Sequence, residues 1–117
     1  MTAITVTYPR KGQIQAVWNL VNGAVPKTGV PLDAARWPIK SVQVTGTAGD
    51  GGSLTIEGSN DGQTWEALND AEGNEATLTD EGLVQLLENP AFIRPSLTAG
   101  DAATDFVITV VGVVGDA

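Results

Sequence analysis

The 117-residue chain contains no cysteine and no histidine. Without cysteine there is no disulfide framework and no thiolate metal site, and without histidine the usual pairs of a nucleophile and an imidazole base cannot be built. Carboxylate pairs remain formally possible among Asp61, Glu66, Asp70 and Glu72, but acidic turns are usually only solvated, and their spacing matches no calcium-binding loop. We therefore expect no enzyme, no catalytic residues, no bound metal and no cofactor.

Long apolar runs are also missing. No stretch approaches the ~18 apolar residues that a membrane helix requires. The N-terminal MTAITVTYPRK has no basic region followed by an apolar run, so no secretory signal peptide is predicted. These features predict a soluble protein that is made in the cytoplasm and has no membrane partner. Hydrophobic residues make up 42% of the chain, which suffices for one domain with a core over residues 1–117.

Basic residues are scarce and unevenly placed. Residues 1–40 hold five of the six basic residues and one acid, Asp33, so this part carries a net charge of +4. The five basic residues are Arg10, Lys11, Lys27, Arg36 and Lys40. Residues 41–117 hold thirteen acids and one arginine, which gives −12 and a total of −8. Such asymmetry predicts oriented electrostatic contacts, unless strands from the two parts interleave and the charges average out. The acidic total argues against nucleic acid as a partner, because phosphate binding needs a basic surface.

Short alternating stretches fill most of the chain. Strands are predicted over residues 3–8, 13–21, 41–47, 53–59, 65–68, 75–79, 91–99 and 106–114. Most of them alternate apolar and polar residues with the period of a half-buried strand, whereas the last is apolar on both faces. Turns rich in glycine, asparagine and aspartate separate these stretches. About eight short strands predict an all-β fold, namely an antiparallel β-sandwich of jelly-roll type, with a closed barrel as the alternative.

The clearest hairpin spans residues 53–68. Leu54 and Ile56 share one face of its first strand, and Asn60-Asp61-Gly62 supplies the turn. Trp65 opens the return strand. Because Trp18 and Trp65 both alternate with core positions, both are predicted to be buried.

One short helix is predicted near residues 80–88. Thr79 or Asp80 can cap it, and Leu83, Leu86 and Leu87 form a stripe with the i, i+3, i+4 spacing of a helix face. Gly82 limits this helix to about two turns, which would plug one end of the sandwich.

Two residues disturb the predicted strands. Ile39 has the wrong parity to join the apolar face of residues 41–47, which predicts a bulge or kink near Lys40. Pro95 cannot donate a ladder hydrogen bond, which predicts that residues 91–99 form an edge strand or a bulged strand.

Candidate contact elements lie in the N-terminal third and at the C-terminus. These elements are the N-terminal arm (about residues 1–12) and a loop without periodicity (about residues 23–38). The loop carries Lys27, Arg36 and Trp37, and arginine and tryptophan are enriched among the residues that dominate protein interfaces. The alternative for Trp37 is that it packs over one end of the core. The last strand is apolar on both faces, so a neighbouring element or another subunit should cover Val107, Val111 and Val113.

Two resemblances bear on function. Gly58-Ser59-Asn60-Asp61-Gly62 followed by Trp65 resembles the GSNDG-x-x-W hairpin of discoidin-type carbohydrate- and lipid-binding domains, although the cysteines that flank it there are missing. More widely, residues 40–112 resemble small virion structural proteins of tailed bacteriophages. That resemblance is carried by SVQVTGTAGDGGSLTIEGSNDGQTW, by the turn with Leu68, Asp70, Gly73 and Asn74, and by Ile93-Arg94-Pro95 with Gly100-Asp101.

The wider resemblance implies a capsid cement or decoration protein of jelly-roll type. Such a protein is expected on the virion, on the outside of the capsid, with the major capsid protein and its own copies (dimer or trimer) as partners. The expected interface residues are Arg10, Lys11, Lys27, Arg36, Trp37, Val107, Val111 and Val113. The N-terminal third matches the resemblance least. The alternatives are a carbohydrate-binding module, for which Trp37 would be the exposed aromatic platform, and a phage tail or fibre component.

Overall fold

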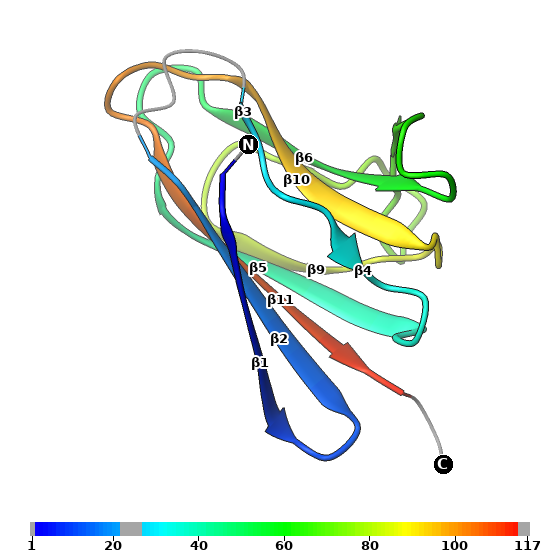
Figure 1. Cartoon of the computed structure of the whole chain (residues 1–117). Coiled ribbons are helices and arrows are strands. Elements are labelled where there is room, and N and C mark those ends of the chain that lie inside the picture. The colour runs from blue at the N-terminus through cyan, green and yellow to red at the C-terminus, as the bar shows by residue number, and fades with distance from the viewer. Residues whose placement is uncertain (1, 22–26, 115–117) are drawn as a thin grey trace.

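Two antiparallel sheets face each other in the computed structural model, which describes residues 2–21 and 27–114 (Figure 1). The described residues form eleven strands. The five-stranded sheet has the order β1 (Ile4–Arg10), β2 (Gln13–Leu20), β11 (Asp105–Val113), β5 (Ile39–Thr47) and β9 (Gly82–Gln85). The six-stranded sheet contains β3 (Lys27–Thr28), β10 (Phe92–Ala99), β6 (Ser53–Ser59) and β7 (Glu66–Ala67), with β4 (Leu32–Asp33) paired to β10 and β8 (Thr77–Leu78) paired to β6.

Beyond the β1–β2 hairpin, the chain winds back and forth between the two sheets. β2, β5, β9 and β11 lie in the five-stranded sheet, and the strands between them in sequence lie in the other. This is the winding of a jelly roll, so the predicted sandwich is confirmed and the closed barrel is not formed. All eight predicted strands are present, and the short β3, β4 and β9 were not predicted.

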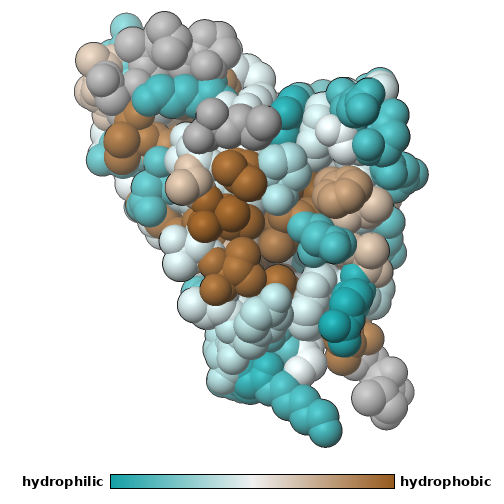
Figure 2. Space-filling model, viewed as in Figure 1, coloured by the Kyte–Doolittle hydropathy of each residue, from teal (hydrophilic) through white to brown (hydrophobic). Residues whose placement is uncertain are grey.

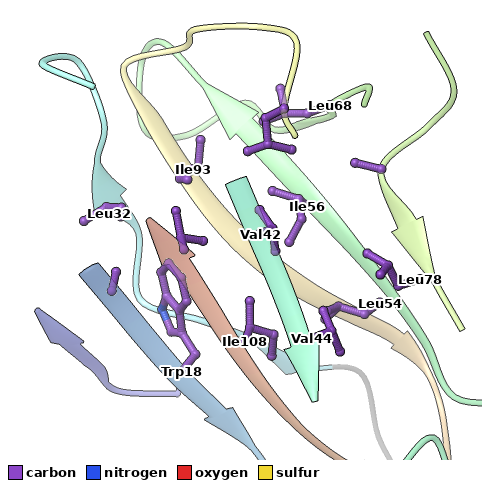
Figure 3. Close-up of a cluster of buried hydrophobic side chains, with 14 of the residues drawn as sticks. Trp18, Leu32, Val42, Val44, Leu54, Ile56, Leu68, Leu78, Ile93 and Ile108 are labelled. Atoms are coloured by element: carbon purple, nitrogen blue, oxygen red, sulfur yellow. The ribbon is translucent and has the colours of Figure 1, made fainter. Parts of the chain in front are cut away.

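The core fills the space between the sheets (Figure 3). The alternation in β2 predicts its inward face correctly, since Ile14, Ala16, Trp18 and Leu20 are all buried. Trp18 is fully buried, and its indole Nε1 donates a hydrogen bond of 2.9 Å to the carbonyl oxygen of Val30. One residue of the first sheet thereby fixes the segment that joins β3 to β4 across the core.

The predicted helix near residues 80–88 is wrong, because this segment forms β9 and the bridge that follows it. Val84 pairs with Val42 and Leu86 is buried, whereas Leu83 and Leu87 are 67% and 55% exposed. Residues two apart therefore share a face, and the leucines form no single stripe. A short apolar segment is compatible with both the helical period of 3.6 residues and the strand period of two. The strand forms here because β5 supplies backbone hydrogen-bond partners, whereas an isolated two-turn helix is only marginally stable.

The predicted bulge near Lys40 is also wrong. β5 pairs regularly with β11 along its whole length, so Ile39 points outward and Lys40 points into the core, where it is only 1% exposed. Lys40 Nζ donates hydrogen bonds to the carbonyl oxygen of Trp37 at 2.7 Å and to Asn89 Oδ1 at 2.9 Å. The ammonium group therefore links the segments that precede β5 and β10. Burial lowers the pKa of Lys40 below its ordinary value.

We expect Lys40→Met to change how stability depends on pH above neutrality. The unfolded chain binds the lysine proton more tightly than the folded chain does. Wild-type stability should therefore rise with pH between the lowered folded pKa and the ordinary value of about 10.4. The methionine variant lacks this gain but keeps every other titrating group. Urea unfolding at about pH 8 and about pH 10 should show the stability difference shifting in favour of wild type, and two parallel profiles would contradict the inference.

β10 is not an edge strand, although it contains Pro95. It pairs with β6 on one side and with β3 and β4 on the other. Pro95 lies between the residues that pair with β3 and those that pair with β4, and its carbonyl accepts a hydrogen bond of 3.0 Å from Gly29. Because the N and O atoms of one residue in an antiparallel strand point to the same side, the missing N–H faces that gap and costs no bond to β6. The register shift of β10 occurs later, between Leu97 and Ala99.

The turn of the central hairpin forms as predicted between β6 and β7. Asp61 Oδ1 accepts hydrogen bonds of 2.8 Å from the backbone N–H groups of Thr64 and Gln63 and from the Ser59 hydroxyl. These donors, Thr64 first, lower the pKa of the Asp61 carboxyl well below its ordinary value. The motif shared with discoidin-type domains therefore acts here as a turn.

Candidate partner-binding surfaces

An apolar groove of about 430 Å³ lies along β1, between the two sheets. It is lined by residues of β1 and β2, of β4 and the residue before it, and of the loop that follows β4: Ile4, Val6, Tyr8, Ile14, Pro31, Leu32, Asp33, Arg36 and Trp37. Figure 2 shows hydrophobic side chains gathered in this hollow. Seven of the nine lining residues are aliphatic or aromatic and two are charged, and polar atoms make up nearly as much of the exposed lining as apolar atoms.

The groove exists because the second sheet does not cover the inward face of β1. Ile4 pairs with Trp18 and Val6 with Ala16, so both β1 side chains point to the core side of their sheet. The start of β1 is held against the other sheet by a bridge between Thr2 and Gly29. Farther along, Val6 is still 37% exposed. The expected N-terminal arm is therefore an edge strand with an uncovered apolar face.

Trp37 closes one end of the core and borders the groove. The residue is only 7% exposed, so the prediction that it packs over the core is the correct one, and the exposed aromatic platform expected for sugar binding is wrong. Its ring lies 6.5 Å from that of Tyr8, and the Arg36 guanidinium lies 6.0 Å from its centroid. A side chain at Gly112 would meet Trp37 Cβ at 2.8 Å, so glycine is required for this close packing.

The charge asymmetry of the sequence is also present in space. β1, β3 and β4 lie at one edge of the sandwich, and β7, β8 and β9 lie at the other. Arg10 and Lys11 lie where β1 turns into β2, and Arg36 lines the groove. Ten of the fourteen acids fall within residues 50–88, the segment that forms β6 to β9. Strands from the two parts of the sequence do interleave, since β11 lies between β2 and β5 and β10 pairs with β3 and β4. These two strands carry only Arg94 and Asp105 as charged residues, so the charges of the two edges are not averaged out, and the groove lies at the basic edge of an acidic molecule.

Not all predicted interface residues lie at the groove. Lys27, at the start of β3, donates a hydrogen bond to the Val21 carbonyl, just beyond the end of β2 farthest from Arg10 and Lys11. The loop predicted for residues 23–38 contains β3 and β4, and its residues 23–26 lie outside the described part of the chain. Val107, Val111 and Val113 are half-buried on the outward face of β11.

The sequence did contain a signal for the β1 side of the groove. Ile4, Val6 and Tyr8 alternate with Thr5 and Thr7 in the first predicted strand, and all three line the groove, but this alternation does not say whether the apolar face is covered. Nothing in the sequence indicated that Pro31 and Leu32 would form the opposite wall, because that requires the pairing of β4 with β10.

Trp65 is not a core residue, contrary to the prediction. It is half-buried at the start of β7, with the Arg94 guanidinium 4.1 Å from its ring centroid. Arg94 Nε also lies 2.9 Å from Glu57 Oε1. One face of the ring is thus occupied by a paired cation, as in a cation–π contact that stabilises the hairpin.

Within residues 2–21 and 27–114 no group of three or more acidic, histidine or cysteine side chains is arranged to hold a metal ion. The same described residues include no helix long and apolar enough to cross a membrane.

Two solved structures share the fold. SPBc2 prophage-derived protein YomS superposes with a TM-score of 0.63 over 92% of this chain and 99% of its own, at 7% sequence identity. Recombinant oxalate oxidase in complex with glycolate gives a TM-score of 0.52 over 99% of this chain, which spans about half (53%) of that protein, at 11% identity. At such identities the likeness shows the fold alone. No protein-family model matches the chain, and no curated protein matches it in sequence.

Proposed function

We propose that this chain is a bacteriophage capsid cement protein, which binds the shell of the major capsid protein from outside and stabilises it. The observation that carries the proposal is the groove along β1: an open surface with exposed apolar side chains beside the free edge of a strand, at the basic edge of an acidic molecule. The function is structural, and the partner is a protein segment.

The shape of the groove suits an extended segment of a capsid subunit. β1 pairs with β2 on one side only, so its other edge offers backbone groups to a further strand. Val6 and Tyr8 offer apolar contact to that segment. Pro9 and the register shift between Thr7 and Arg10 interrupt the far end of this edge, which limits self-aggregation and leaves the first part of β1 for the partner.

The charge distribution orients the chain relative to an acidic capsid segment. Arg36 lines the groove beside Asp33, and Arg10 and Lys11 lie at the β1–β2 turn of the same edge, whereas the opposite edge carries most of the acids. An acidic capsid segment would therefore be attracted to the β1 edge and repelled by the other. Complementary potentials of this kind govern orientation and association rate more than final affinity. Trp37 supports the site from beneath as part of its floor.

Stabilisation then follows from mass action. A protein that binds the assembled shell but not its separate subunits shifts the equilibrium toward the shell, and each occupied site adds to that shift. Enzymatic activity is not required.

The phage setting has two supports. The first is the resemblance of residues 40–112 to phage virion proteins, and the second is that the chain shares its fold over nearly its full length with a prophage-derived protein. The alternative of a carbohydrate-binding module loses its platform, since Trp37 is buried and Arg94 covers one face of Trp65. A tail or fibre position remains the competing location within the virion.

Quantitative mass spectrometry of purified phage particles tests this proposal. We expect the chain in particles, in many copies and in a fixed ratio to the major capsid protein, and retained on heads after tails are removed. Recovery with isolated tails would contradict the capsid position, and absence from particles would contradict a virion role altogether.

A further inference from the structure

The outward face of the five-stranded sheet forms a second surface, opposite the core. The register of the strands sets its composition, because directly paired residues share a face. Rows of residues run across the sheet, for example Thr5, Val17, Thr109, Gln43 and Leu83 from β1 to β9. Three further rows each contain one residue of β2, one of β11 and one of β5. They are Gln15–Val111–Ser41, Asn19–Val107–Thr45 and Gln13–Val113–Ile39.

This face carries no charge over its central rows, among the strands that the structure describes. The residues named above are all valine, isoleucine, leucine, threonine, serine, glutamine or asparagine. The whole chain, by contrast, carries twenty charged residues and a net charge of −8. Solvent-facing sheet surfaces are normally rich in charged side chains, and depletion of charge marks the centre of protein interfaces.

The middle of the face is apolar. Val107, Val111 and Val113 line the outward side of β11, the central strand of the sheet, and no element of the described chain forms a layer over them. A hollow of about 260 Å³ lies beside Val111 and Val113, bordered by Ile39, Ser41, Gln85 and the buried Lys40, whose ammonium group is bonded inside the core. A side chain from a second molecule can fill this hollow.

We infer that this face is a self-association surface, on which a second copy of the chain packs face to face about a two-fold axis. Five strands at ~4.8 Å spacing and seven residues at ~3.4 Å rise give about 600 Å² per copy and about 1,200 Å² for the pair, which reaches the lower end of stable specific interfaces. An uncharged face is also where two molecules of charge −8 can meet with the least repulsion.

Charges at the two ends of the face favour one orientation of the second copy over the other. Arg10 pairs directly with Gln13, so it shares the outward face at the β1–β2 turn, and Asp105 lies at the opposite end of β11. A two-fold axis that lies in the interface across the strands reverses the strand direction in the second copy. The Arg10 end of each copy then faces the Asp105 end of the other. The groove, on the inward side of β1, stays open in this dimer.

Sedimentation velocity over a concentration series tests the inference on the free protein, independently of any shell. Wild type should approach twice the chain mass of 12.1 kDa, about 24 kDa. Val111→Lys places two like charges close to the two-fold axis and should raise the dissociation constant at least ~100-fold. Gln43→Lys, at an exposed position with no core contact, should do the same without affecting folding, and Ala67→Lys on exposed β7 is the matched control that leaves the dimer intact.

Charge reversal tests the orientation. Arg10→Glu and Asp105→Lys should each weaken the dimer, and the double variant should recover wild-type association. A monomer at every concentration overturns the inference, and if Gln43→Lys then abolishes binding to shells, the face belongs to the capsid protein instead. A dimer unaffected by both lysine variants overturns the choice of face, and failure of the double variant to recover overturns the orientation.

Discussion

Replacing Trp18 with alanine is expected to lower the free energy of unfolding by about 4 kcal/mol. The side chain is fully buried, and it packs so closely against the β3–β4 connection that a Cβ at Gly29 would lie 2.4 Å from Trp18 Cδ1. Truncation leaves a cavity and removes the hydrogen-bond donor of the Val30 carbonyl. In a domain of this size the loss corresponds to a fall in Tm on the order of 15 °C, measurable by thermal unfolding.

Two further variants test why this stability is lost: Trp18→Phe isolates the hydrogen bond, and Trp65→Ala is the control for burial. Trp18→Phe keeps most of the buried ring and removes only the donor, so about 1–2 kcal/mol should be lost. Trp65→Ala removes an equally large side chain from the half-buried hairpin position and should also cost much less than Trp18→Ala. Equal losses at Trp18 and Trp65 would show that the assignment of the core is wrong.

The strands were predictable because each is a local pattern, and their alternation survives in the structure from Ile14–Leu20 to the last strand. The helix was mispredicted because Leu83, Leu86 and Leu87 fit two periods, and only the position of β9 beside β5 decides between them. Lys40 was missed for a related reason. A lysine at an inward position contradicts the local pattern, and the acceptors that make it tolerable, Trp37 and Asn89, come from other parts of the chain.

The candidate surfaces were predictable only in part. The basic N-terminal third and the apolar last strand were identified from composition, and the structure separates them only in part, since Arg36 borders the groove whereas Arg10 shares the outward face of the last strand. The groove depends on how far β1 diverges from the second sheet, and the uncharged face depends on which strands are neighbours. Both are properties of sheet order, which a local pattern does not encode.

Replacing Val6 with glutamate is expected to weaken binding to capsid shells about 100-fold. The side chain is 37% exposed on an edge strand, so the new carboxylate can reach water and stability should change by only about 0.5 kcal/mol. When the capsid segment occupies the groove, however, the new carboxylate would be buried beneath it and would be repelled by the acidic charge of that segment. Co-sedimentation with shells at a series of concentrations gives both affinities.

The matched control is Ala67→Glu, which adds the same charge at an exposed position of β7, away from the groove. It should bind shells as wild type does. If both variants bind equally weakly, net charge rather than the groove governs association, and if Val6→Glu binds as tightly as wild type, the groove is not the contact.

The most direct test of the central claim is the binding of the wild-type chain to shells assembled from the major capsid protein of the phage that encodes it. We expect saturable co-sedimentation at a fixed ratio to capsid subunits, with a rise in the temperature at which the shells come apart. A chain that stays in the supernatant at every concentration, while the shells disassemble at an unchanged temperature, would contradict it.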